Sequence, residues 1–244
     1  MSKEKKSDTL PVSWEDQMAK AAKAIATVER PSVNKISMRG GILQIDDRPL
    51  TDNLFTCVIV GAVHEQVRFD EKWDPTKIVP PVCYAFSEKA AVKGEMAPDE
   101  NVPSPISPIC AGCASRSFGE GGEKPKCQSR RRIAVVAWNS DNTLDDEIYT
   151  LSFPAYSSGK VYQAYASEVA ISENRPPYGV ITEVKLANHP KWQYILGFKN
   201  LGRVPDDAMG PVMNKVGAAL AALTTPYDMT GPAVEEPTPL KGTS

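Results

Sequence analysis

The chain of 244 residues is long enough for one large domain or two small ones, and its hydrophobic content of 41% is ordinary for a soluble protein. Its formal net charge of −2 excludes any inference of a nucleic-acid partner from bulk basicity, so such a partner has to be inferred from local charge. No apolar run follows the opening MSKEKKSDT, and no stretch approaches membrane-spanning length. We therefore expect a cytoplasmic protein without a secretory signal or a membrane helix.

The first part of the chain predicts a helix followed by strands. Residues 14–29 have the apolar spacing of an amphipathic helix, which Pro31 ends. From Val33 the apolar period changes to two, which is typical of a meander of strands. The long apolar run 54–69 predicts a strand that bends at Gly61.

The strand pattern is interrupted between about residues 70 and 131, where seven prolines lie between Pro75 and Pro108. A loop of this length inside a domain is usually functional or disordered. In the helix predicted next, over 158–172, we expect Val161, Tyr165, Val169 and Ile171 on the buried side. The remaining predicted elements are strands at 131–138, 148–153, 180–186 and 193–199, and a final helix over 206–223.

This order of elements predicts a strand-rich α+β fold. We expect an OB-like (oligonucleotide-binding) β-barrel with a long four-cysteine zinc-loop insertion and flanking helices. The predicted organisation is an N-terminal tail and helix over 1–31, one OB-like domain over 32–226 with its insertion at about 70–131, and a disordered proline-rich tail over 227–244.

Four of the five cysteines fall in or beside the interruption, at Cys83, Cys110, Cys113 and Cys127. Two residues separate Cys110 from Cys113, a spacing that lets both thiolates bind one ion, and the flanking cysteines complete a structural Zn²⁺ site. Reduced core cysteines and a redox pair are the alternatives. Cys57 lies in an apolar run and is expected in the core.

Basic and aromatic side chains surround these cysteines. Between residues 116 and 132 six cationic side chains stand against two acidic ones. Cations for phosphates and rings for bases are typical of a surface that binds single-stranded nucleic acid. The predicted nucleic-acid-binding residues are Arg116, Phe118, Lys124, Lys126, Arg130, Arg131, Arg132, Trp138, Tyr84 and Phe86; the alternative is a solvated loop with ordinary core aromatics.

The segments GGILQID, PPVCYAFSE, CAGCASRSFG and GEKPKCQSRRRIAVV, in this order, resemble a group of bacteriophage proteins of the replication or recombination region. Some of that group are described as single-stranded-DNA-binding proteins. The resemblance covers roughly residues 33–199. It implies binding to single-stranded DNA, replication or recombination proteins as further partners, and a location in the cytoplasm of the bacterial host.

Signals for catalysis are few, so we expect a non-enzymatic protein. The segment 157–160 ends like a phosphate-binding loop, but Pro154 stands where that motif needs glycine. Glu183 and Lys185 share a predicted strand face and leave a nuclease as the less favoured alternative. A zinc-containing interaction module that docks on a replication or transcription machine is the other alternative.

Overall fold

The computed structural model describes residues 34–45, 48–71, 79–90 and 94–229, all within one compact unit that begins at Val33. The predicted helix at 14–29 lies outside these residues, as do 230–244 of the predicted tail. The elements, in chain order, are β1 (Lys35–Arg39), β2 (Ile42–Ile45), β3 (Arg48–Pro49), β4 (Leu54–Arg68), β5 (Cys83–Ser87), β6 (Cys127–Ala137), β7 (Tyr149–Pro154), α2 (Ser158–Ser172), β8 (Val180–His189), β9 (Gln193–Arg203) and α3 (Met209–Leu223).

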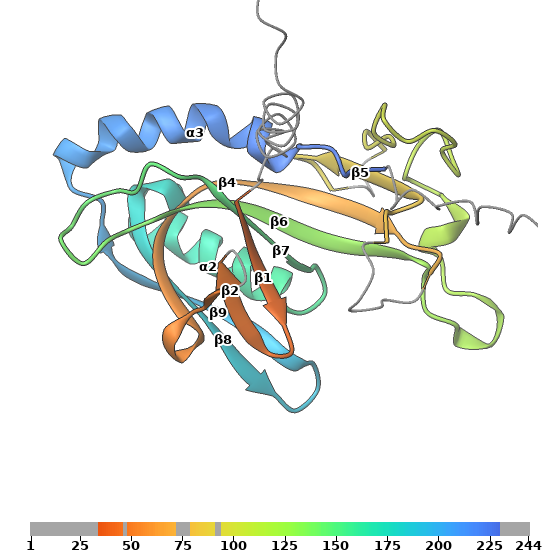
Figure 1. The fold of residues 1–244 in the computed structure, drawn as a ribbon, viewed down its shortest axis with the longest axis horizontal. Coiled ribbons are helices and arrows are strands. Elements are labelled where there is room, and N and C mark those ends of the chain that lie inside the picture. The colour runs from red at the N-terminus through yellow and green to blue at the C-terminus, as the bar shows by residue number, and fades with distance from the viewer. Residues whose placement is uncertain (1–33, 46–47, 72–78, 91–93, 230–244) are drawn as a thin grey trace, which may run out of the picture. The chain divides into compact units, whose positions relative to one another are not determined.

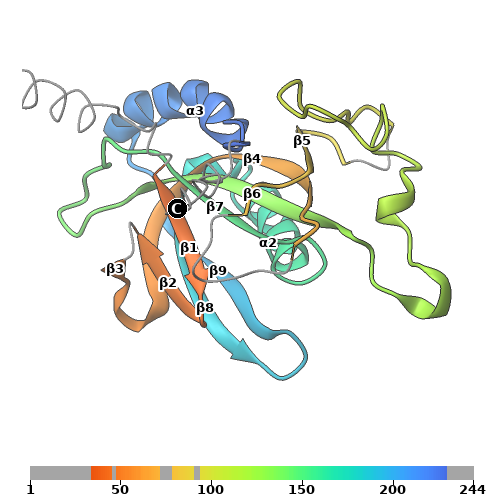
Figure 2. The same ribbon diagram turned by 45° about the vertical axis from the view of Figure 1, so that its right-hand side comes forward.

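All the strands belong to one sheet, with the order β3-β2-β1-β7-β6-β4-β8-β9 and with β5 added beside β4. Their pairings are antiparallel except that between β1 and β7. The sheet curls into a half-barrel (Figures 1 and 2). The described part of the chain therefore has a strand-rich α+β fold, as predicted, with two long helices among its strands.

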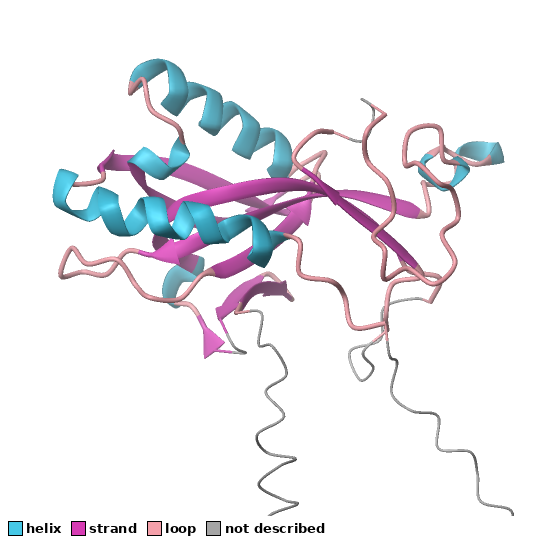
Figure 3. Ribbon diagram, turned by 90° about the horizontal axis from the view of Figure 1, so that it is seen from above, coloured by secondary structure: helices cyan, strands magenta, loops and turns pink. Residues whose placement is uncertain are grey.

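The middle parts of β4 and β6, around Cys57–Val60 and Ile133–Val136, are buried on both faces. Cys57 and Ile59 of β4 point into the cluster that contains the buried side chains of α2, whereas Val58 and Val60 point into the cluster that contains those of α3. This alternation explains why β4 reads as a continuous apolar run. Figure 3 shows both helices in cyan with the strands in magenta.

The predicted bend in the long strand is confirmed. Between Ile59 and Gly61 the register of β4 against β6 shifts, which marks a bulge. A Cβ on Gly61 would lie 3.0 Å from both Ala219 Cβ and Leu223 Cδ1. Glycine therefore lets α3 approach the sheet closely at this position.

Helix α2 has the predicted bounds, but its buried face differs from the prediction. Tyr165 and Val169 are buried as expected, while Ile171 is 85% exposed and Tyr162 is buried instead. Tyr162 packs edge-on against the ring of Phe198 in β9, on which Tyr165 also stacks.

Two boundaries also differ from the prediction. The segment predicted as an insertion contains β5, which pairs with His64–Arg68 of β4, and β6 begins at Cys127. At the other end, Tyr227 and Met229 pack against the cluster of Val67, Tyr84 and Val102. The packed domain therefore continues to Met229, three residues beyond the expected boundary.

Residues 88–126, which join β5 to β6, form what we call the cysteine loop. Its described part contains two short 3-10 turns, η3 (Ala114–Arg116) and η4 (Glu120–Gly122). Met96 is 1% exposed and packs with Cys110 of the loop and Ala85 of β5, so a small apolar cluster joins the loop to the sheet.

Candidate metal centre

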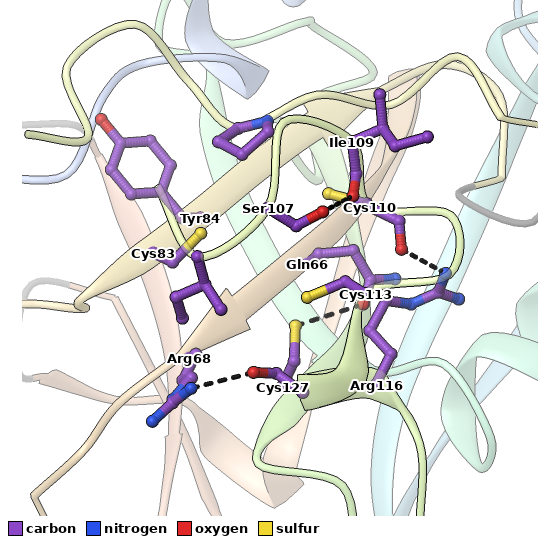
Figure 4. Close-up of a pocket in the computed structure, with 13 residues that line it drawn as sticks. Gln66, Arg68, Cys83, Tyr84, Ser107, Ile109, Cys110, Cys113, Arg116 and Cys127 are labelled. Carbon is purple, nitrogen blue, oxygen red and sulfur yellow. Dashed lines mark hydrogen bonds between the residues drawn. The ribbon is translucent and has the colours of Figure 1, made fainter. Parts of the chain in front are cut away.

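The four cysteines of the predicted site line one small cavity of about 20 Å³ (Figure 4). Cys83 begins β5 and Cys127 begins β6, and both are register partners of Arg68 in β4. Residues that pair across strands point to the same face of a sheet, so the ladder brings these two cysteines together. Cys110 and Cys113 reach the cavity from the cysteine loop.

Backbone hydrogen bonds hold the two loop cysteines over the sheet. The N–H of Cys110 donates to the carbonyl of Met96 at 2.8 Å, and the N–H of Cys113 donates to the carbonyl of Cys110 at 3.3 Å. Gly112 between them has a φ of 75°, in the left-handed region that favours glycine. The tight turn is therefore built into the sequence of the two-residue spacer.

The cavity disfavours isolated thiolates. Burial raises the pKa of Cys110 to about 11, with further increases from Cys127, Cys83 and Cys113, whereas Arg116 lowers it. Burial, together with Cys83 and Cys113, likewise raises the pKa of Cys127 to about 11. Four thiols that share one cavity ionise together only if a cation compensates their charge.

The donor set suits a zinc ion. Four cysteine sulfurs are the closed, tetrahedral ligand set of structural zinc sites, and the cavity has the volume of roughly one water-sized occupant. Among the residues that the structure describes, no group of three or more His, Cys, Asp or Glu side chains is already arranged to hold a metal. The thiol of Cys127 is at present engaged within the cavity, where its Sγ donates to Gln66 Oε1 at 3.6 Å.

The predicted basic surface divides into an exposed part and a buried part. Lys124, Lys126 and Phe118 are exposed on the cysteine loop, and Phe118 has 72% of its surface accessible. Arg116 lies instead against the cysteines and lines the cavity. Only the exposed side chains are available to a ligand that approaches from solvent.

The three consecutive arginines of β6 do not form one patch, because neighbouring strand residues point to opposite faces. Arg132 is 7% exposed, with its Nη2 2.6 Å from Glu65 Oε1 and its Nη1 donating to the carbonyl of Leu223 at 3.1 Å. It is unavailable to a phosphate, which corrects the prediction. Arg130, on the same face, keeps 27% of its side chain exposed and lies 3.8 Å from Glu65 Oε2.

Arg131 points to the opposite face, towards α2. Its guanidinium carbon lies 5.6 Å from the ring centroid of Tyr162. Burial, followed by the charge of Arg131, lowers the pKa of the neighbouring His64 to about 4. Arg131 and His64 are thus separated by the sheet from Arg130 and Arg132.

The predicted aromatic surface is largely core. Tyr84 is 1% exposed and packs against Phe86 and Tyr227, with ring centroids 5.5 Å and 5.0 Å apart respectively. Trp138 is 8% exposed and belongs to the cluster under α3. The prediction that Tyr84 and Trp138 stack on bases is therefore corrected, whereas Phe118 remains accessible.

Sequence reasoning missed a buried polar cluster centred on Glu65, which is 0% exposed. Its carboxylate accepts hydrogen bonds from Arg132, Ser152 and Tyr227. Burial alone raises the pKa of Glu65, but Arg132, Arg130 and these hydroxyls together hold it below its usual value. The sequence does contain a signal for this cluster. Glu65 is an acidic residue inside an apolar strand, and the strand that pairs with it carries arginines two residues apart.

The pair considered for a nuclease lies on another part of the sheet. Glu183 and Lys185 flank Val184, which belongs to the cluster on the α2 side, so both point to the other face of β8. Glu183 is the register partner of Thr56 in β4 and of Lys199 in β9.

None of the helices that the structure describes combines the length and hydropathy needed to cross a bilayer. Comparison with protein-family models, curated proteins and solved structures finds no significant match to this chain. The resemblance to phage proteins therefore stays a prediction.

Proposed function

We propose that this chain is a non-enzymatic single-stranded-DNA-binding protein whose cysteine loop is held to the sheet by a structural zinc ion. The observation that carries the proposal is the meeting of Cys83, Cys110, Cys113 and Cys127 at one cavity, from two strands and a loop. Zinc supplies a cross-link between these segments when it binds. Four thiolates fill its coordination shell, which favours a structural over a catalytic role.

The proposed DNA surface is smaller than the one that sequence alone predicts. It comprises Lys124, Lys126 and Phe118 on the cysteine loop, with the partly exposed Arg130 at the adjoining strand. Cations together with an accessible ring suit a flexible strand, which offers phosphates to the cations and unstacked bases to the ring. The OB-like interpretation belongs to this proposal, and the curl of the sheet supports it.

Fluorescently labelled single-stranded and double-stranded DNA and RNA, titrated at two salt concentrations, test this function. Binding to single-stranded DNA should weaken steeply with salt, and a Lys124→Ala plus Lys126→Ala variant should flatten the log–log slope by roughly 0.7 for each lost contact. Phe118→Ala should instead lose about 1–3 kcal/mol of affinity with the slope nearly intact. Lys185→Ala, an exposed cation on β8, is the matched control and should bind as the wild type does.

Failure of the wild type to bind single-stranded DNA at low salt would rule out this function. The interaction module would then be favoured, because the cysteine loop exposes apolar as well as basic side chains. Ile106 and Ile109 are 42% and 46% exposed on the same loop as Phe118. A phage replication or recombination protein is the partner class that the resemblance implies.

A further inference from the structure

Arg116 stands out among the cations around the cysteine cavity. It closes the η3 turn, three residues after Cys113, and its backbone N–H donates to the carbonyl of Cys113 at 3.0 Å. Its Nη1 donates to the carbonyl of Cys110 at 2.9 Å, which points the guanidinium along the cavity wall (Figure 4). Its position is therefore coupled to the backbone of both loop cysteines.

The Nε of Arg116 is buried and has no hydrogen-bond partner among the described residues. Burying a charged donor without an acceptor is unfavourable, so such a group calls for an explanation. The other cation of the cavity differs. Arg68 donates to Asp70 at 2.8 Å and to Ser115 at 2.8 Å, whereas no ion pair of Arg116 is found in the described part of the chain.

The candidate acceptors for this Nε–H are the sulfur atoms of the four cysteines, because they line the same cavity as Arg116. The hydrogen bond from its Nη1 to the carbonyl of Cys110 holds the guanidinium beside these thiols. Four thiolates around one dication carry a net charge of roughly −2, which a nearby guanidinium partly offsets. Ligand atoms of metal sites regularly accept hydrogen bonds from such outer partners, which orient them.

We infer that Arg116 is the positioning residue of the metal centre: its Nε–H donates to a cysteine thiolate of the metal-bound site, and its charge compensates the thiolates. This inference rests on the proposed zinc site. It gives the unpartnered Nε an acceptor and the excess negative charge a counter-charge. It also assigns to the metal centre, rather than to DNA, a residue that sequence alone places in the basic surface.

Cobalt(II), which reports its ligands through its absorption spectrum, is the probe. The reduced, full-length protein is titrated with Co²⁺, and Zn²⁺ affinity is then measured by competition with a chromophoric chelator. Arg116→Met keeps an unbranched apolar stem but removes the donors and the charge, and should weaken metal binding about 10–100-fold. Lys124→Met removes an exposed cation from the same loop and should leave affinity within about twofold.

The spectrum separates a hydrogen bond to sulfur from a general effect on folding. Loss of an N–H···S bond raises the energy of the sulfur lone pairs, so the sulfur-to-cobalt charge-transfer band should move to longer wavelength in Arg116→Met. Arg116→Lys keeps the charge but loses the Nε–H and the planar set of guanidinium donors. Its metal affinity should fall between those of the wild type and the Met variant. If Arg116→Met does not fold, as judged by circular dichroism, the Lys variant decides by the same two readouts.

Wild-type protein with a four-thiolate cobalt spectrum, together with Arg116 variants of unchanged affinity and unchanged band position, would overturn the inference and leave the zinc site standing. Wild-type protein that binds no Co²⁺ would overturn the zinc site and the inference with it. The two failures are therefore distinguishable.

Discussion

Two polar regions lie on opposite faces of the same β4–β5–β6 ladder, and they differ in how completely the chain satisfies them. On the α3 side, Glu65 accepts hydrogen bonds from Arg132 and Tyr227 at 2.6 Å and 2.5 Å. On the other side, four cysteines meet beside Arg116, whose Nε has no partner among the described residues. The carboxylate of the first region has its hydrogen-bond partners within the chain, whereas the second region contains four thiols and an unpartnered donor that the proposed zinc ion would organise.

The difference follows from the alternation of a strand. Glu65 and Arg68 stand three residues apart in β4, so their side chains point to opposite faces. Pairing then places Arg130 beside Glu65 and places Cys83 and Cys127 beside Arg68. The same three strands thus build a buried ion cluster on one face and the sheet half of a candidate metal centre on the other.

Of the substitutions considered, removal of the Glu65 carboxylate should lower the free energy of unfolding most. Glu65→Ala leaves Arg132 buried with its charge uncompensated, so the free energy of unfolding should fall by about 3–5 kcal/mol in a denaturant titration. Glu173→Ala, which removes an exposed ion pair with Arg203, is the control and should scarcely shift the transition. Equal effects of the two substitutions would show that the Glu65 cluster contributes no more than a surface pair.

On acidification, the two regions should lose their structure at different pH values. Because the pKa of Glu65 is lower in the folded state, its contribution is complete above the pKa of an unfolded glutamate, about 4.3, and is lost as the pH falls through the folded value. Thiolates bound to a metal take up protons and release the ion as the pH falls, so the cysteine loop should loosen first. Limited proteolysis of the loop and circular dichroism of the sheet, followed together from pH 7 downwards, check this order. Simultaneous loss of both signals would contradict the separation.

Many helices and strands of the fold could be predicted because the spacing of apolar residues in the sequence indicates them. The bounds of α2 and the bend at Gly61 follow from apolar spacing and one glycine. The strand β5 was missed because prolines surround its five residues, and its stability comes from pairing with His64–Arg68, which no local pattern shows. The curl of the sheet and its order also depend on such non-local pairings.

The candidate site was predictable in its ligands but not in its surroundings. Cysteine spacing pointed to Cys83, Cys110, Cys113 and Cys127, and the structure brings all four to one cavity. The run Arg130–Arg132 looked like one patch because charge was counted along the sequence, although alternation sends its middle residue to the other face. A count taken at every second residue would have separated Arg131 from its neighbours.

Metal analysis of the purified protein tests the central claim most directly. The wild type should contain one zinc ion per chain, and the Cys110→Ser plus Cys113→Ser variant should contain none, because the site loses two of four ligands. Cys57→Ala is the matched control and should keep its zinc, since Cys57 is 0% exposed in the core under α2. Wild-type protein that neither contains zinc nor takes it up under reducing conditions, or a double variant that retains it, would contradict the metal centre.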